Sequence, residues 1–136
     1  MQLNEEKMLT DLIQQQRVQA LNVSQLQLRI GEEIQSLSQL KARKECFLNS
    51  YDQLFRYISL WLLVRGYDLT NYQPHQVLKT VCVLHCPDWE MDKIIRQRHQ
   101  LKKKLSPLVS QDTYMELQHC LQYFQHYLQA YVCVSL

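Results

Sequence analysis

Turn-forming residues are scarce in this chain, which holds 2 Gly and 3 Pro among its 136 residues. All-β folds and large α/β enzymes need Gly and Pro at many turns, so this scarcity excludes both classes. Gly31 and Gly66 also lie far apart, so the chain has neither of the glycine-rich loops, G-x-G-x-x-G and G-x-x-x-x-G-K-[ST], that cradle phosphates. The sequence therefore predicts an all-α protein.

Long apolar runs and a strong net charge are absent as well. The longest apolar run covers residues 60–64, whereas a helix that crosses a bilayer needs about 20 apolar residues. The first seven residues are polar and acidic, unlike a signal peptide, and five cysteines cannot all pair with one another. These features predict a reduced, cytoplasmic protein with no membrane segment. A net charge of +2 is too small to indicate nucleic-acid binding by itself.

Apolar residues recur at helical spacing along most of the chain and predict six helices in one domain, residues 1–136. We expect no strand, and we interpret residues 17–23 and 67–74 as loops. Short connections between long amphipathic helices are typical of an up-and-down bundle. The expected helices cover residues 4–16, 24–43, 45 or 49 to 65, 75–85, 88 to Pro107, and Ser110 or Thr113 to 131.

Local signals predict several helix ends. Ser24 and Gln27 have the spacing of a capping box, and Asp88 is a good N-cap. Gly66 stands where a left-handed C-cap is expected. Gly31, inside a helix, should cost about 1 kcal/mol relative to Ala, and it indicates either a close helix contact or simple tolerance. The helix that ends at 65 carries two large apolar groups on nearly every turn, so we expect it to be the central helix.

The helix that begins at 88 has an unusual charge pattern. Residues 93–104 contain no Asp or Glu. Their basic residues are Lys93, Arg96, Arg98, Lys102, Lys103 and Lys104. Helical phase places Arg98 in one stripe with Met91, Ile94, Leu101 and Leu105. A guanidinium turned inward needs partners or a wet cleft, because burying it unpaired costs several kcal/mol. The alternative is that Arg98 lies at the edge of the stripe and extends to water along its methylene groups.

The order of these motifs resembles the HEPN superfamily of helical domains (higher eukaryotes and prokaryotes nucleotide-binding). In many prokaryotic members a Tyr-rich central helix closes with Gly-Tyr, as at Gly66-Tyr67, and a His follows in the loop, as at His75. A later helix carries an Arg-x-Arg-Asn-like motif, similar to the Arg96–His99 segment. The likeness is spread over residues 9–130, and the matching pieces are 9–13, 51–55, 62–67, 74–75 and 92–99.

The resemblance implies a homodimer built around the helix that carries Arg98. Active HEPN ribonucleases have Arg followed after four to six residues by His, and two such motifs form one metal-independent site. Here the corresponding positions, Lys103, Lys104 and Leu105, contain no His. The resemblance thus predicts a degenerate member that binds RNA, a nucleotide or a protein partner. It also implies a toxin–antitoxin or defence setting with a nucleotidyltransferase-like antitoxin as partner. The expected anion-binding residues are the six basic residues named above and His75.

Two other functions stay open. The first is a metal-independent ribonuclease in which Arg98 holds the phosphate and His99, Lys103, or His75 of a second subunit supplies the acid–base chemistry. An ordinary Lys is a poor general base near neutral pH and a good phosphate ligand, and His99 points about 100° away from Arg98 on the helix. The second is a purely structural helical protein.

Further patterns have a structural and a functional interpretation. Cys82, His85 and Cys86 could share a metal ion, but no fourth ligand stands at a readable spacing, so we predict no metal and no cofactor. The run 102–104 fits either a solvated helix end or a contact with phosphate. The aromatic stripe near the C-terminus fits either base stacking or a core or dimer seam, and its members are Tyr114, Tyr123, Phe124, Tyr127 and Tyr131.

Overall fold

The computed structural model describes residues 2–104 and 108–132, and it confirms an all-α helical bundle. Seven helices and two short strands lie within these residues. Their order is α1 (Gln2–Gln14), β1 (Val18–Ala20), α2 (Val23–Lys41), α3 (Phe47–Leu63), β2 (Tyr67–Leu69), α4 (Pro74–His85), α5 (Met91–Lys102), α6 (Gln111–Tyr127) and α7 (Gln129–Val132). None of the helices in the described part of the chain is long and apolar enough to cross a membrane.

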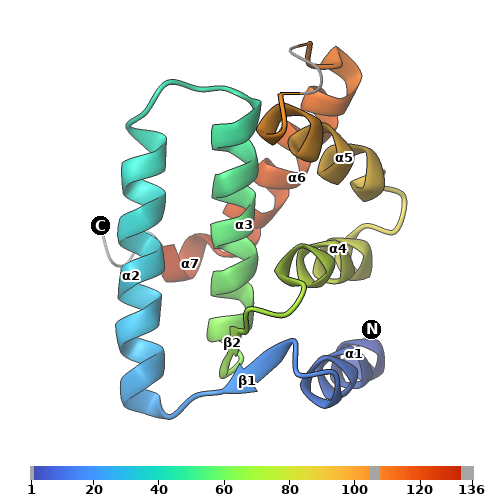
Figure 1. Cartoon of the computed structure of the whole chain (residues 1–136). Helices are drawn as coiled ribbons and strands as arrows, with labels where there is room; N and C mark the ends of the chain where they lie inside the picture. The colour runs from blue at the N-terminus through green and yellow to red at the C-terminus, as the bar shows by residue number, and fades with distance from the viewer. Residues whose placement is uncertain (1, 105–107, 133–136) are drawn as a thin grey trace.

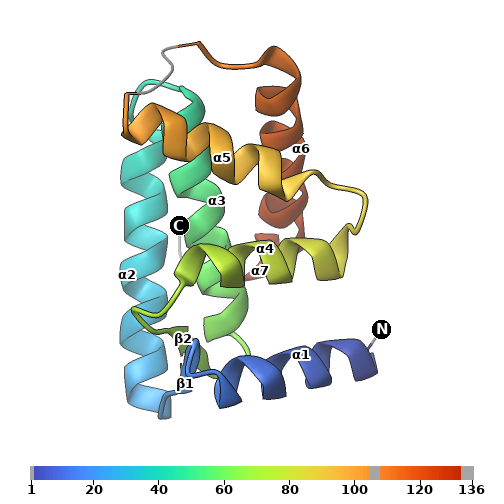
Figure 2. The ribbon, with the colours of Figure 1, turned by 45° about the vertical axis from the view of Figure 1, so that its right-hand side comes forward.

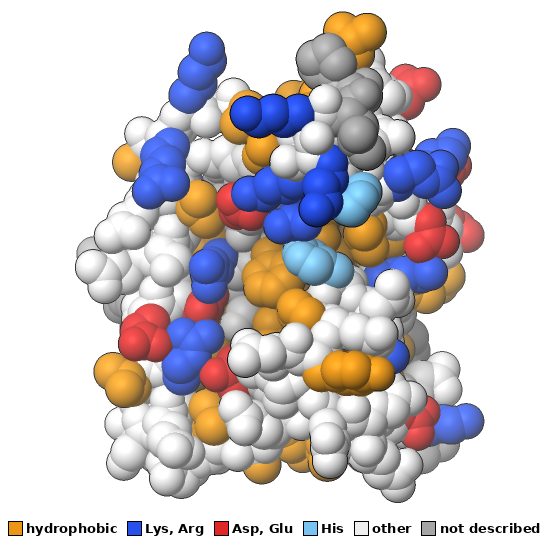
Figure 3. Space-filling view, viewed as in Figure 1, with side chains coloured by type: hydrophobic (Ala, Val, Ile, Leu, Met, Phe, Trp, Pro, Cys, Tyr) orange, Lys and Arg blue, Asp and Glu red, His pale blue; other side chains and the backbone are white. Residues whose placement is uncertain are grey.

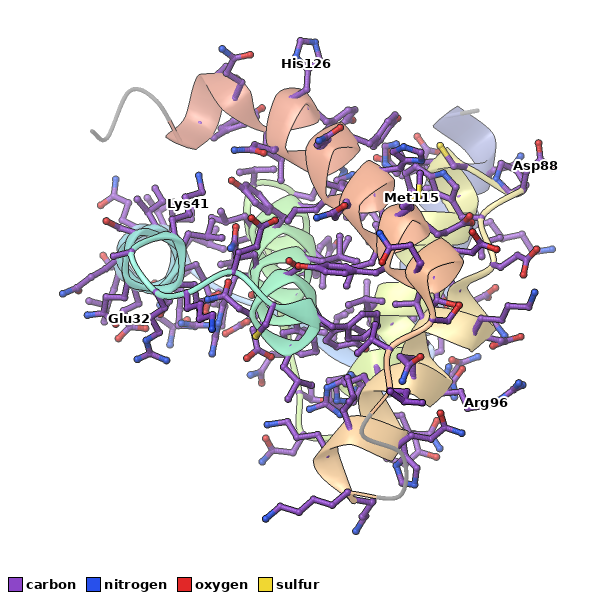
Figure 4. The ribbon with its side chains drawn as sticks, turned by 90° about the horizontal axis from the view of Figure 1, so that it is seen from above. Glu32, Lys41, Asp88, Arg96, Met115 and His126 are labelled. Atoms are coloured by element: carbon purple, nitrogen blue, oxygen red, sulfur yellow. The ribbon has the colours of Figure 1, made fainter. Side chains whose placement is uncertain are left out.

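The helices form two sets that cross each other. Helices α2 and α3 run alongside one another, α6 packs on α3 at a slant, and α1, α4 and α5 lie across α2 and α3 (Figures 1, 2 and 4). The up-and-down arrangement therefore describes α2 and α3 but not the three crossing helices. Helix α3 is the central one, as predicted, because residues 60–63 are buried on every side.

The two strands correct the prediction that residues 17–23 and 67–74 are loops. β1 and β2 pair antiparallel, with Val18 opposite Leu69. The strands, Val-Gln-Ala and Tyr-Asp-Leu, alternate apolar and polar residues, but three residues are fewer than the four to eight over which such alternation indicates a strand. Tertiary contacts hold the pair in place, because Val18 is buried and Arg29 of α2 donates to Asp68 of β2 at 2.9 Å.

Several helix ends differ from the prediction. α2 is capped by Asn22, whose side chain accepts a hydrogen bond from the Gln25 backbone in a complete capping box, so Ser24 is not the cap. α5 begins at Met91 after Glu90, and not at Asp88. Pro107, the predicted end of this helix, and Leu105 of its apolar stripe lie outside the described residues.

Other local predictions agree with the structure. Gly66 has φ +98°, the left-handed region in which glycine is favoured. Ser110 caps α6 by accepting a hydrogen bond from the Thr113 backbone. A Cβ at Gly31 would meet no heavy atom within 4 Å, so this glycine marks no close helix contact and is simply tolerated. The predicted single helix to 131 is broken instead at Leu128, which is buried between α6 and α7.

Candidate anion-binding site

Arg98 lies on the inward side of α5. Helical phase turns Met91 and Ile94 into the core, and both are fully buried. Arg98 follows Met91 by two turns on the same side of the helix. It is half-buried and lies over α3, where its guanidinium carbon is 5.1 Å from the centre of the Tyr51 ring. This distance is within the range of a cation–π contact.

The Arg98 guanidinium has no polar partner among the residues that the structure describes. Its Nε atom is buried and makes no hydrogen bond, and none of its nitrogens forms an ion pair within residues 4–104 and 108–131. A buried donor without an acceptor is costly, of the order of 1–3 kcal/mol. An anion bound beside Tyr51 would supply the missing acceptor.

Tyr51 joins Arg98 to the start of α4. The tyrosine is 1% exposed, and its hydroxyl lies 2.8 Å from Nδ1 of His75. Burial raises the pKa of Tyr51 well above its ordinary range, and the nearby Arg98 charge only partly opposes this shift. The phenol is therefore protonated at neutral pH. Since it has no second hydrogen-bond partner in the described ranges, we assign the phenol as the donor and Nδ1 of His75 as the acceptor.

His75 thereby presents an N–H group to a ligand. Burial lowers the pKa of His75, the Arg98 charge lowers it further, and Asp52 opposes both effects. The ring is neutral at neutral pH, and an Nδ1 atom that accepts from Tyr51 leaves the proton on Nε2. The Phe55 ring, centred 5.3 Å away, holds the imidazole from another side. Arg98 and His75 thus offer hydrogen-bond donors that both belong to side chains in contact with Tyr51.

The structure separates the predicted basic residues into two groups. Arg98 and His75 both contact Tyr51, whereas Lys93 pairs with Glu90 and Arg96 extends away from the body of the molecule (Figure 4). The other predicted candidates, His99, Lys102, Lys103 and Lys104, are exposed at the end of α5. Lys and Arg side chains gather around histidines on this face (Figure 3).

A second groove lies between α5 and α6, with a volume of about 500 Å³. Lys93 and Arg96 line it together with three acids, Glu90, Asp112 and Glu116. The negative charges of these acids offset the positive charges of Lys93 and Arg96, and Lys93 is already paired with Glu90. The acids therefore make this groove a poor place for an anion.

Of the three candidate metal ligands, only Cys82 belongs to the core. Cys82 is fully buried, and burial raises the pKa of its thiol, while Cys86 follows the last turn of α4. Nδ1 of His85 lies 2.9 Å from the hydroxyl of Tyr123. Across the described ranges, no group of three or more His, Cys, Asp or Glu side chains is arranged to hold a metal ion.

Most rings of the aromatic stripe of α6 contact other rings of the molecule, and Phe124 is the one that is fully buried. Tyr123, Phe124 and Tyr127 surround the His85 ring, with centroid distances of 4.8–5.5 Å, and Tyr114 packs on Phe47. These contacts correspond to the core interpretation. Tyr131 is 50% exposed and contributes no ring contact within the described residues.

Sequence reasoning missed Tyr51, Asp52 and Phe55 as parts of the site. All three lie on α3: Tyr51 and Phe55 contact His75, and the Asp52 charge acts on it, but the two aromatic residues look like ordinary core residues. One signal was available, because the hydroxyl of a buried tyrosine needs a hydrogen-bond partner. The sequence does not say that this partner is 24 residues away.

Comparisons of the chain with models of protein families, with curated proteins and with solved structures found no match. The HEPN resemblance therefore stays a prediction. The functional argument below depends on the geometry around Arg98, Tyr51 and His75.

Proposed function

We propose that this protein binds the phosphate group of RNA or of a nucleotide through Arg98 and His75. The observation that supports the proposal is the Arg98 guanidinium, which stacks on Tyr51 beside His75 and has no acceptor among the described residues. A bound phosphate would accept hydrogen bonds from the guanidinium and from Nε2–H of His75.

Phosphate fits this site better than an uncharged ligand. The planar guanidinium donates two parallel hydrogen bonds to two phosphate oxygens, and it keeps its charge at every physiological pH. The exposed Lys102, Lys103 and Lys104 follow on the same helix and would attract further phosphates of an RNA chain. RNA or a nucleotide is therefore the preferred ligand over a neutral metabolite.

The geometry favours binding over catalysis. A ribonuclease of this type needs a base, and neutral His75 has its proton on Nε2 because Nδ1 accepts from Tyr51. His99 and Lys103 are exposed, and neither makes a polar contact with Arg98. One observation favours the ribonuclease as a second candidate: His75 and Arg98 of the same chain both contact Tyr51, so a second subunit is not needed to bring them together.

The HEPN resemblance adds an assembly to the proposal. It implies a homodimer with the Arg98 helices at its centre and a nucleotidyltransferase-like antitoxin as a partner. Sedimentation of the purified chain tests the dimer. A monomer at all concentrations would remove the assembly from the proposal and leave the phosphate site unchanged.

The central experiment measures the binding of a short fluorescein-labelled oligoribonucleotide by anisotropy at low salt. We expect Arg98→Ala to weaken binding by about 10- to 100-fold, the loss of hydrogen bonds to a charged group. Arg96→Ala is the matched control, because it removes the same charge from the other side of α5. Equal binding by the wild type and Arg98→Ala would contradict the proposal, and so would equal losses in both variants.

The same samples distinguish the ribonuclease. Binding without cleavage in the presence of EDTA is the expected result. Cleavage in EDTA that is lost in both His75→Gln and Arg98→Ala would show that the second candidate is correct.

A further inference from the structure

A groove between α2 and α3 lies next to the proposed phosphate site. It has a volume of about 270 Å³, and its lining includes Asp52 and Phe55 of α3 and Arg43 beyond the end of α2. Phe55 also contacts the His75 ring, and the Asp52 charge acts on His75. Phe55 thus belongs to both the groove and the surroundings of His75, so the groove adjoins the phosphate site.

We propose that this groove holds the base of a guanine nucleoside phosphate, either free or within RNA, whose phosphate is bound by Arg98 and His75. The inference rests on the proposed function and adds the identity of the base. It assigns stacking to Phe55, and selection among the four bases to Asp52 and Arg43.

The size of the groove suits one base. Sites for drug-sized ligands usually have volumes of about 300–1,000 Å³. A groove of about 270 Å³ lies just below that range, so it is small for a dinucleotide cofactor and adequate for a single base with the edge of its ribose.

Phe55 provides an apolar surface for the base. The ring is only partly buried, and its contact with His75, at an interplanar angle of 55°, leaves part of the ring on the groove side. Stacking of a base on an aromatic side chain contributes about 1–3 kcal/mol and does not depend on which base is bound. Phe55 therefore accounts for affinity and not for selectivity.

Asp52 accounts for selectivity. Its side chain makes no hydrogen bond or ion pair with any residue in the described ranges, so both carboxylate oxygens are available. Guanine presents two adjacent donors, N1–H and the N2 amino group, which match the two oxygens as an Arg fork matches a carboxylate. The pairing edges of adenine, cytosine and uracil each present one donor group.

The basic residues of the groove suit the opposite edge of guanine. Arg43 is exposed and forms no ion pair with a described residue, and an arginine donates to O6 and N7 of guanine more often than to any other pair of base atoms. Arg56 also lines the groove, but it is already paired with the buried Glu33 at 3.0 Å, which reduces its attraction for the phosphate of the ligand. The negative Asp52 has the same effect, so the phosphate is directed to Arg98.

Calorimetric titration with four nucleoside monophosphates and with inorganic pyrophosphate tests the inference. We expect GMP to bind about 10-fold more tightly than AMP, CMP or UMP, the value of one charged hydrogen bond. Asp52→Asn replaces one acceptor with a donor and should remove this preference, while pyrophosphate binding is unchanged or stronger. Asp112→Asn, in the α5–α6 groove, removes the same charge and should leave the preference intact.

The outcomes separate the two proposals. Equal affinity for GMP and AMP, with both lost in Arg98→Ala, would overturn the guanine site and leave the phosphate site standing. Failure of pyrophosphate, all four nucleotides and RNA to bind would overturn both. An oligoribonucleotide with one guanine that binds much more tightly than GMP would identify RNA as the source of the base, and equal affinities would identify the free nucleotide.

Discussion

The two ends of α4 carry clusters of the same three residue types. At the start of the helix His75 meets the hydroxyl of Tyr51 at 2.8 Å, with Arg98 over the Tyr51 ring. At its end His85 meets the hydroxyl of Tyr123 at 2.9 Å, and Arg65 lies nearby. Burial, followed by the charge of the neighbouring arginine, lowers the pKa of both histidines.

The two arginines differ in their partners. Arg65 lies 3.6 Å from the centre of the Trp61 ring, pairs with Glu5, and donates to the Trp61 carbonyl and to the Tyr127 hydroxyl. Arg98 stacks on Tyr51 and has none of these polar contacts among the described residues. The comparison teaches that hydrogen-bond saturation, and not residue type, separates an arginine that stabilises the fold from one that can bind a ligand.

The histidines differ in what surrounds their rings. Nε2 of His85 is buried without a partner in the described ranges, and four aromatic rings, those of Trp61, Tyr123, Phe124 and Tyr127, surround the imidazole. His75 contacts the rings of Tyr51 and Phe55, and Phe55 also lines an open groove. Both histidines are half-buried, but the Nε2 atom of His85 is buried, so His75 is the one beside which a ligand has room.

The largest expected difference is in stability. Arg65→Ala should lower the free energy of unfolding by about 2–4 kcal/mol, because it breaks a partly buried ion pair and leaves Glu5 and Trp61 without their partner. Arg98→Ala should lower it by less than about 1 kcal/mol, since it also removes an unpaired buried donor. Urea unfolding of both variants measures the contrast. Equal losses would show that Arg98 is a structural residue.

The two tyrosines provide a second contrast. Tyr51→Phe and Tyr123→Phe each remove a hydrogen bond to a histidine, and each should cost about 1 kcal/mol of stability. Only Tyr51→Phe should also weaken RNA binding, by about 3- to 10-fold, because His75 then loses the partner that holds its proton on Nε2. Anisotropy with both variants decides this point, and an RNA affinity reduced by Tyr123→Phe as much as by Tyr51→Phe would remove the role given to His75.

The sequence predicted those features that depend on residues close together in the chain. The central position of α3, the left-handed Gly66 and the Ser110 cap follow from local apolar and capping patterns. The inward turn of Arg98 follows from helical phase alone. The prediction failed for β1 and β2, because only the pairing of segments about 50 residues apart makes them strands.

The contrast between Arg65 and Arg98 could not be predicted from the sequence, for the same reason. The partners of Arg65 lie as far away as Glu5 and Tyr127, which are 60 and 62 residues distant along the chain. No periodic pattern relates such positions. Asp52 and Phe55 were missed similarly, since they belong to a site only through the fold that brings His75 beside them.

Acidification should affect stability and RNA binding in opposite directions. The pKa values of His75 and His85 are lowered in the folded protein, so below the unfolded value of about 6.5 the unfolded chain binds more protons. Stability is therefore fully present above pH 6.5 and falls as the pH drops toward the folded values. RNA affinity should rise a few-fold over the same range, because a phosphate favours protonated His75.

Single variants assign the two pH effects. His75→Gln should abolish the rise in RNA affinity at acid pH and keep the part of the stability loss that comes from His85. His85→Gln should keep the rise in RNA affinity and keep only the part of the stability loss that comes from His75. Unfolding and anisotropy measured on the same samples from pH 7.5 to 5.5 test this assignment, and a rise in affinity that survives His75→Gln would exclude His75 as a ligand.

The smallest expected effect concerns the exposed lysines at the end of α5. Each contact with a phosphate of single-stranded RNA contributes about 0.7 to the slope of log affinity against log salt. Lys103→Gln should therefore reduce the slope by about that amount and change the affinity at low salt only a few-fold, while Lys7→Gln on α1 should change neither. A slope that is unchanged by Lys103→Gln but reduced by Arg98→Ala would confine the ligand to the Tyr51 cluster. That result would favour a free nucleotide over an RNA chain, since a chain is needed to contact the Tyr51 cluster and Lys103 at the same time.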